Sequence, residues 1–370
     1  MTNGRFSGLT WDHPRGYRAL EAASESGPVA WVRQPLEGFE SHPIADLAAR
    51  HDLLVLDHPH IGEAIAEACL QPIEDWFTPA DIAGWASGTI GRTLESYRWD
   101  RRHYALPLDV AMQVAARDPD RMPEAPDSWD DVMRLSETCP VALSLAGPHA
   151  LLTFFSLCLS LGEEPGGEDL ISDAAGLEAL RRIMRLAERA PKGTEGLNPI
   201  ALLEAIAARV GIALVPLVFG YVNYAVPARS RAAVAFSDAP RETPSGRRGS
   251  VLGGTGIGIT RRAKPDGDLL AHLRWLMSDE AQLRFIPDHD GQPSARSAWL
   301  SPEVNAAWGG FYAATAETAE QAWVRPRFDG YIAFQTAASD VLRVALEAKA
   351  PAGDTLSRLR TLWRAGLARA

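Results

Sequence analysis

The chain has 370 residues, of which 46% are hydrophobic and 23% are charged, the composition of an ordinary soluble globular protein. Because this length exceeds what one hydrophobic core usually organises, we expect two lobes. The formal net charge of -10 argues against a nucleic-acid partner, since phosphate binding needs a basic surface.

The sequence indicates neither an export signal nor a membrane span. The first predicted strand begins at Phe6 with no secretory signal before it, and no apolar run is long enough to cross a bilayer. We therefore expect a cytoplasmic protein, unless an export segment is missing from this sequence. The three cysteines, Cys69, Cys139 and Cys158, form no Cys-x-x-Cys pair and have mostly apolar neighbours, which predicts buried free thiols.

Two strand–loop–helix units near the N-terminus share one motif. Phe6–Trp11 is followed by Asp12-His13-Pro14, and the unbroken apolar run Leu53–Leu56 is followed by Asp57-His58-Pro59. Neighbouring parallel strands end on the same edge of a sheet, and ligands of open α/β sheets bind at that edge. We therefore expect both loops to face one cleft, where the two histidines lie within reach of one ligand.

The middle of the chain alternates strands, loops and helices. A third strand, at residues 29–32, precedes a loop containing Glu37 and Phe39. Residues 96–106 predict a hairpin, and a proline at 107 between two strand-like runs marks a point where the chain can leave one lobe for the other. Helices are predicted from about residue 129, over 148–161 as a buried core helix, from 173, over 199–209, over 268–285 and from about 354 to the end.

Aromatic and glycine clusters occur at other loop ends. Tyr221 and Tyr224 follow a predicted strand, and such rings, like that of Trp11, can stack on a sugar or another flat ligand face, although core packing explains many single aromatic residues. The Gly253–Gly258 segment fits neither the dinucleotide pattern nor the P-loop, and we expect it to allow a tight interlobe crossing. Arg325 could grip ligand hydroxyls or a carboxylate through its guanidinium group. No cofactor is predicted.

The Asp-His loops also admit other chemistry. Carboxylates and imidazoles serve proton transfer and metal binding, but the sequence contains no standard metal spacing and no complete catalytic motif. We predict no metal site and no catalytic residues. Two alternatives stay open: an enzyme that uses these loops, or a ferric-ion binder that uses a tyrosine with a histidine.

Taken in order, the landmarks resemble the extracellular solute-binding proteins of ABC importers, in the branch that includes maltose-binding and other sugar-binding proteins. The resemblance covers nearly the whole chain, and the segments that carry it are 52–57, 62–64, 70–75, 96–109, 126–132, 251–254, 275–282 and 291–294. It implies the two-lobed type II periplasmic-binding-protein fold of the α/β class. Each lobe would be a mostly parallel sheet flanked by helices, and several hinge crossings would join the lobes.

Mapped on this sequence, the resemblance implies a lobe of residues 1–108 plus 253–298 and a lobe of residues 109–252 plus 299–370. Ligand contacts in the family lie in loops that match the following residues: Trp11, Asp12, His13, Glu37, Phe39, Asp57, His58, Asp109, Tyr221, Tyr224, Gly254, Thr255 and Arg325. The resemblance also implies a monomer that serves ABC permease subunits, and it implies a periplasmic or cell-surface location.

These observations together predict a protein that closes by hinge motion around a small polar molecule and catalyses nothing. The sequence shows no cluster of tryptophans around the predicted cleft, which favours a small ligand over a long sugar chain. A sugar is the first expectation, and the mixture of Asp, His and Arg leaves an organic acid or a zwitterion open.

Overall fold

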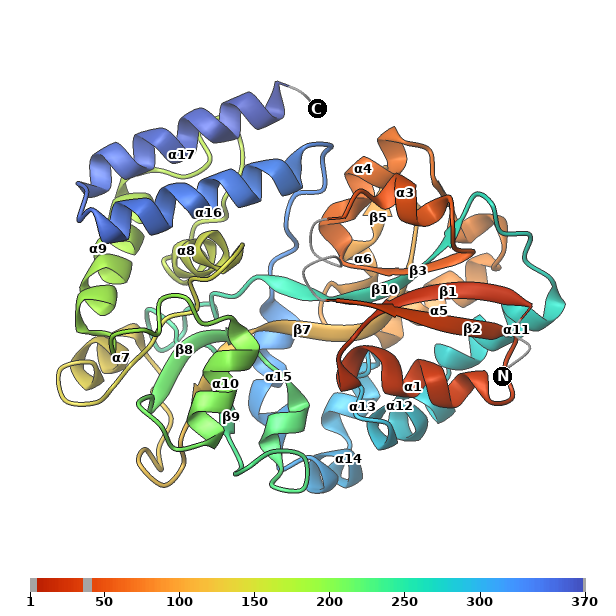
Figure 1. The fold of residues 1–370 in the computed structure, drawn as a ribbon, viewed down its shortest axis with the longest axis horizontal. Coiled ribbons are helices and arrows are strands. Elements are labelled where there is room, and N and C mark those ends of the chain that lie inside the picture. Colours follow the sequence, from red (N-terminus) through yellow and green to blue (C-terminus); the bar gives the residue numbers. More distant parts are fainter. Residues whose placement is uncertain (1–4, 36–41, 369–370) are drawn as a thin grey trace. The chain divides into compact units, whose positions relative to one another are not determined.

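A computed structural model describes residues 5–35 and 42–368. The chain forms two compact units, each with its own strands and helices (Figure 1). Unit 1 comprises Met1–Ala111, Gly253–Ala307 and Arg325–Asp329, and unit 2 comprises Met112–Leu252, Trp308–Val324 and Gly330–Ala370. The chain therefore passes between the units at five places.

The sheet of unit 1 begins with three parallel strands. β1 (Phe6–Trp11) pairs along its whole length with β2 (Val29–Gln34), and Gly8 and Leu9 of β1 also pair with β3 (Leu53–Leu56). All four residues of β3 are buried, as expected for a strand covered on both faces. Because the three strands are parallel, the loops after β1 and β3 leave from the same edge of the sheet.

Pairing changes direction beyond β3. β10 (Leu252–Thr260) runs antiparallel to β3 and to the short β4 (Leu70–Gln71). β5 (Arg98–Trp99) and β6 (Arg102–His103) form the hairpin predicted near residue 100. The mostly parallel pairing that we expected thus holds along β2, β1 and β3, while the later strands of this unit pair antiparallel.

Helices lie on both sides of these strands. In Figure 1, α1 (Pro14–Ser24) is on one side, and α3 (Ile44–Ala48) and α4 (Ile61–Ala66) are on the other. The remaining helical segments of unit 1 are η1 (His58–His60), η2 (Ile73–Asp75), α5 (Pro79–Gly88), α6 (Thr93–Ser96), α11 (Gly267–Leu276), the π-helical turn η4 (Ala281–Phe285), α12 (Ile286–Asp288), α13 (Arg296–Leu300) and α14 (Pro302–Ala307).

Unit 2 is built around the end of a long strand. β7 (Leu106–Arg117) begins in unit 1, and its last residues pair antiparallel with β8 (Leu214–Phe219) and β9 (Ala235–Ser237). The named strands of this unit therefore pair antiparallel rather than parallel. Its helical segments are α7 (Trp129–Leu135), α8 (His149–Ser160), α9 (Asp173–Arg189), α10 (Pro199–Ala207), η3 (Val222–Ala225), α15 (Phe311–Gln321), α16 (Tyr331–Glu347) and α17 (Ala352–Leu367).

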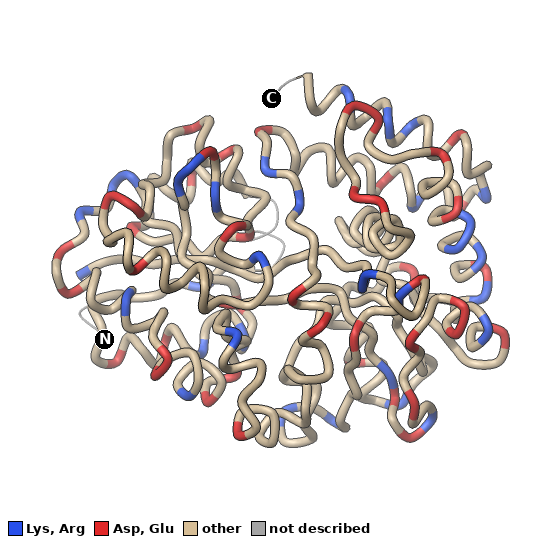
Figure 2. The backbone as a smooth tube through the Cα atoms, turned by 180° about the vertical axis from the view of Figure 1, so that it is seen from behind, with Lys and Arg blue, Asp and Glu red and all other residues tan. Residues whose placement is uncertain are grey.

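The core of unit 2 is mainly helical. Every residue of α8 is buried, which agrees with the apolar run expected to form a core helix. α16 packs against both α8 and α17, and α9 contacts α8 and α17 (Figure 1). Acidic and basic residues are interspersed along the chain in both units rather than gathered in blocks (Figure 2).

A tight backbone contact in unit 1 depends on glycine. Gly254 has a φ of +100°, and a Cβ built there would lie 2.2 Å from the carbonyl oxygen of Asp109. Only glycine allows both this backbone conformation and this approach. The glycine cluster thus serves close chain packing, as its sequence indicated.

We expect Gly254→Ala to lower the free energy of unfolding by about 1–3 kcal/mol, because it adds left-handed strain and a steric clash. Urea denaturation followed by circular dichroism measures this change. Gly267→Ala is the matched control, because no heavy atom lies within 4 Å of a Cβ at Gly267. Equal stability of the two variants would contradict this account of Gly254.

Candidate functional site

The loop after β1 places an exposed carboxylate beside a buried indole and a half-buried imidazole. His13 caps α1, and its Nδ1 accepts a hydrogen bond of 3.2 Å from the backbone N–H of Arg15. The His13 ring stacks on Trp11 with centroids 5.2 Å apart, and the Arg15 guanidinium carbon lies 5.1 Å from the centroid of the same indole. Trp11 is only 1% exposed, whereas the side chain of Asp12 is 58% exposed. The polar group that this loop presents to solvent is therefore Asp12.

The packing of Trp11 is set by α1. A Cβ at Gly16 would lie 2.3 Å from the indole, so the ring fits against the helix only because this position is glycine. Burial, followed by the positive charge of Arg15, lowers the pKa of His13 to about 3. His13 is therefore neutral at physiological pH and acts as a helix cap.

The loop after β3 forms a buried cluster with Arg325. The Asp57 carboxylate accepts a hydrogen bond of 2.8 Å from the His58 N–H and forms an ion pair with Arg325. His58 is fully buried, and its Nε2 accepts a hydrogen bond of 3.2 Å from the backbone N–H of Arg325. Asp57 thus holds the side chain of Arg325 and His58 holds its backbone, although both lie more than 260 positions earlier in the chain.

Electrostatics in this cluster fix the protonation states. Although burial alone would raise it, the positive charge of Arg325 holds the pKa of Asp57 well below its usual range. Burial and the same arginine lower the pKa of His58 to about 4. At pH 7 the cluster therefore consists of an ionised Asp57, a neutral His58 and a charged Arg325. The side chain of Asp57 stays 22% exposed, so its carboxylate is within reach of a ligand.

Asp109 provides a second, more deeply buried carboxylate. It is 2% exposed, and its Oδ2 lies 3.0 Å from the Nε of Arg15 in an ion pair. The backbone N–H of Gln292 also faces this carboxylate and favours its ionised form. Burial outweighs the charge of Arg15 and raises the pKa of Asp109 to about 6.

Thr255 adds a buried hydroxyl beside this region. It follows Gly254, whose backbone touches Asp109, and it is 2% exposed. Its Oγ1 has no hydrogen-bond partner within the described parts of the chain. Leaving a buried polar group unsatisfied costs free energy, so a ligand that pairs with it recovers that cost.

Unit 1 therefore contains nine of the predicted site residues, drawn from five stretches of the chain: Trp11, Asp12, His13, Asp57, His58, Asp109, Gly254, Thr255 and Arg325. Glu37 and Phe39 lie outside the described residues. The sequence prediction missed Arg15. A cation in the first turn of a helix is disfavoured by the helix dipole, and this mismatch was a signal that Arg15 has a specific partner.

The two predicted tyrosines belong to unit 2. Tyr221 and Tyr224 flank the start of η3, and both are buried. The Tyr224 hydroxyl donates a hydrogen bond of 2.7 Å to Glu204, and burial together with this carboxylate raises the pKa of Tyr224 well above its ordinary value. Tyr224 is thus a neutral phenol at physiological pH. The role of Tyr221 and Tyr224 toward a ligand stays a prediction.

Neither a metal-binding cluster nor a membrane-spanning helix is found in the part of the chain that the structure describes. Within residues 5–35 and 42–368, no three His, Cys, Asp or Glu side chains are grouped so that they could hold a metal ion. All three cysteines are free; Cys69 and Cys158 are buried, and Cys139 is partly exposed. None of the described helices has the length and apolarity needed to cross a membrane.

Solved structures of known proteins share this fold over nearly the whole chain. An ABC transporter solute-binding protein from Agrobacterium radiobacter K84, in complex with ribitol, is 18% identical with a TM-score of 0.81, covering 97% of this chain and 98% of that one. The maltose-bound MalE3 of T. maritima is 17% identical with a TM-score of 0.78, covering 96% and 98%. A solute-binding protein from Agrobacterium vitis S4 with bound D-mannitol is 16% identical with a TM-score of 0.77, covering 98% of both chains.

These likenesses confirm the predicted type II periplasmic-binding-protein fold. No protein-family model matches the sequence, and none of the curated proteins matches it either. The evidence for the fold is therefore structural, at an identity too low to transfer individual residue roles.

We expect Asp109 to make stability depend on pH. Its folded-state pKa of about 6 is above the ordinary value of 3.8, so its contribution to stability is complete below about pH 4 and is lost as the pH rises through 6. Between pH 4 and pH 7, the free energy of unfolding of the native protein should therefore fall by about 2–3 kcal/mol relative to that of Asp109→Asn.

Denaturant unfolding of both proteins across this pH range measures the difference. The substitution Asp109→Asn takes the charged partner of Arg15 away, but the cost of this is the same at every pH in the range because arginine stays charged. It therefore does not change the difference between the two pH profiles. Parallel pH profiles for the two proteins would contradict the raised pKa.

We expect His58→Ala to lower the free energy of unfolding by about 1–3 kcal/mol, because the substitution leaves the backbone N–H of Arg325 without its acceptor. The loss should be the same at pH 6 and pH 8, since the pKa of about 4 keeps His58 neutral at both. Urea denaturation measures this change. The control is His42→Ala, a half-exposed surface histidine whose removal should cost less than about 0.5 kcal/mol.

Proposed function

We propose that this protein is the solute-binding component of an ABC importer, and that it binds a small neutral polyhydroxy molecule, a sugar or a polyol, without chemical change. The site contains Asp12, Asp57, Asp109 and Thr255 from unit 1. The permease subunits of the importer are its partners, and the protein acts as a monomer outside the cytoplasmic membrane.

The observation that carries this proposal is the balance of charge in unit 1. Each buried carboxylate of the site has its own arginine: Asp109 lies 3.0 Å from Arg15, and Asp57 pairs with Arg325. The exposed Asp12 lies 3.4 Å from Arg33, which also pairs with Glu21. Both imidazoles have pKa values well below neutrality. These groups have no surplus positive charge with which to bind the carboxylate of an acid or a zwitterion, but they offer many oriented hydrogen-bond acceptors and donors.

The fold supports the same ligand class. The similar solved structures hold ribitol, maltose and D-mannitol, which are all uncharged polyhydroxy molecules. Fold by itself does not establish function, so the balanced charges of this chain's own residues are the stronger support.

We expect ribitol, D-mannitol or maltose to raise the melting temperature, whereas sugar acids and amino acids of similar size should not. A ligand at a hundred times its Kd stabilises the folded state by about 2.7 kcal/mol, which differential scanning fluorimetry detects as a shift of several degrees. Nuclear magnetic resonance of the recovered ligand should show it unchanged. Stabilisation by charged solutes alone, or chemical conversion of the ligand, would overturn the proposal.

We expect Asp12→Asn to weaken the ligand found in this way by about tenfold to a hundredfold, the loss of one charge-assisted hydrogen bond. Because Asp12 is exposed, the variant should fold normally. Asp46→Asn removes a similarly exposed carboxylate in the same unit and should leave affinity unchanged. Isothermal titration calorimetry compares the two. If both variants bind as the native protein does, Asp12 is not a ligand contact.

A further inference from the structure

Three of the five points where the chain passes between the units meet at one place in unit 2. One lies before Met112, one after Leu252 and one after Val324. The residues of unit 2 next to these points are Gln113, the 249–252 segment and Trp323. These positions are more than 70 residues apart from one another in the sequence. Their proximity in the fold therefore depends on specific contacts.

Ser156 of the buried helix α8 joins two of these segments. Its hydroxyl donates a hydrogen bond of 2.7 Å to the side-chain oxygen of Gln113 and accepts one of 3.1 Å from the backbone N–H of Val251. The Ser250 hydroxyl in turn donates a hydrogen bond of 2.7 Å to the Gln113 carbonyl. All four residues are completely or almost completely buried, so water does not compete for these bonds.

The third segment is attached to the second by backbone pairing. Val251 and Trp323 form a parallel bridge, in which the Leu252 N–H donates to the Trp323 carbonyl at 2.8 Å and the Trp323 N–H donates to the Ser250 carbonyl at 2.9 Å. The Trp323 ring also contacts Phe155, the residue before Ser156, edge to face with centroids 5.7 Å apart. Helix α8 thus holds all three segments.

Close packing leaves these segments little freedom. A Cβ at Gly249 would lie 2.1 Å from the Ser156 carbonyl oxygen, so the chain touches α8 directly at this point. Gln113 is further fixed by a hydrogen bond of 3.2 Å to the hydroxyl of Thr153, one turn earlier in α8.

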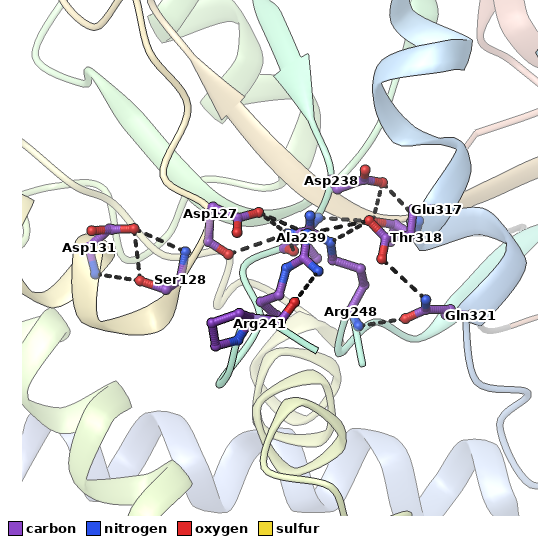
Figure 3. Close-up of polar contacts among 11 residues, drawn as sticks. Asp127, Ser128, Asp131, Asp238, Ala239, Arg241, Arg248, Glu317, Thr318 and Gln321 are labelled. Atoms are coloured by element: carbon purple, nitrogen blue, oxygen red, sulfur yellow. Dashed lines mark hydrogen bonds and ion pairs between the residues drawn. The ribbon is translucent and has the colours of Figure 1, made fainter. Parts of the chain in front are cut away.

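A network of charged side chains links the stretches of chain that come just before residues 249–252 and Trp323 (Figure 3). Arg248 lies 2.7 Å from the Asp127 carboxylate and 3.0 Å from that of Glu317, and its backbone N–H donates to the side chain of Gln321 at 2.7 Å. Arg241 lies 3.1 Å from the same Asp127 carboxylate. The approaches to residues 249–252 and to Trp323 are therefore tied together before either segment reaches α8.

The other two passages differ in their local backbone. After Ala307 and Asp329 the chain enters α15 and α16, whose N-caps Gly310 and Gly330 have φ values of +75° and +90°. A Cβ at either of these two glycines would have no heavy atom within 4 Å. Glycine has the widest backbone freedom of any residue, so changes of conformation concentrate where it occurs.

We infer that Ser156 is a positioning residue that locks three connecting segments to α8, so that the chain flexes at the two capping glycines, Gly310 and Gly330, rather than at these segments. This inference is independent of the proposed ligand, because it concerns the unliganded chain.

Amide hydrogen exchange of the unliganded protein, followed by nuclear magnetic resonance, tests the inference. In the native protein, the amides of Val251, Leu252 and Trp323 should exchange at least about tenfold more slowly than those of Gly310 and Gly330. In Ser156→Ala, exchange of the same three amides should rise about tenfold or more, while the amides of α9 keep their native rates.

Ser160→Ala is the matched control. Ser160 is also buried in α8, but its hydroxyl bonds only within its own helix, to the Leu157 carbonyl at 2.8 Å. It should leave the exchange of Val251, Leu252 and Trp323 unchanged. Should Ser156→Ala fail to fold, Ser250→Ala removes one bond of the same cluster and should raise the exchange of Trp323 alone by about threefold or more.

Two results would overturn the inference. Native-like exchange at Val251 and Trp323 in whichever of the two variants folds would show that the hydroxyl network does not hold these segments. A uniform rise across unit 2 would show that Ser156 supports the unit as a whole rather than the connecting segments.

Discussion

The cost of burying charge shapes unit 1. A buried carboxylate is tolerated only when a cation or several hydrogen-bond donors compensate it, and Asp57 and Asp109 obtain their cations from Arg325 and Arg15. The first of these pairs requires the chain to return to unit 1 for the short stretch 325–329. His58 strengthens that return, since its ring accepts the backbone N–H of Arg325. The proposed ligand site and the path of the chain thus depend on the same ion pair.

The two carboxylates are compensated to different degrees. Asp57 has its arginine and a backbone donor, and its pKa lies well below the usual range. Asp109 is more deeply buried, and burial outweighs Arg15 and the backbone N–H of Gln292 and raises its pKa to about 6. Incomplete compensation of this kind destabilises the unliganded protein and leaves acceptors for a ligand. Binding sites characteristically keep such unsatisfied groups, and Thr255 adds another beside Asp109.

The buried polar groups around α8 in unit 2 are, by contrast, hydrogen-bonded to one another. Around α8, the hydroxyl and amide groups of Ser156, Gln113 and Ser250 all have partners. A fully satisfied buried network is rigid and specifies one geometry. The polar groups of unit 1 are those of the proposed ligand site, whereas the satisfied network of unit 2 is the one inferred to position the chain.

The sequence alone determined the local features of this protein. An apolar run such as Leu53–Leu56, ended by a proline, specifies a buried strand and the loop after it, because burial and proline geometry act over a few residues. The parallel placement of the two Asp-His-Pro loops followed from the same local pattern, and the overall fold followed from the order of many weak landmarks. Gly254 was also correctly placed at a close chain approach.

Only the tertiary structure decided how the polar groups are paired. No periodicity indicates that Asp57 meets Arg325 or that Arg15 meets Asp109, because these partners come from distant segments whose approach depends on the whole packing. The same holds for the antiparallel direction of β10 and for Trp11, whose ring is covered by its neighbours in α1 rather than left open. Local pattern records which residues are apolar or polar, whereas the pairing and pKa of a buried group depend on what the fold places within a few ångströms of it.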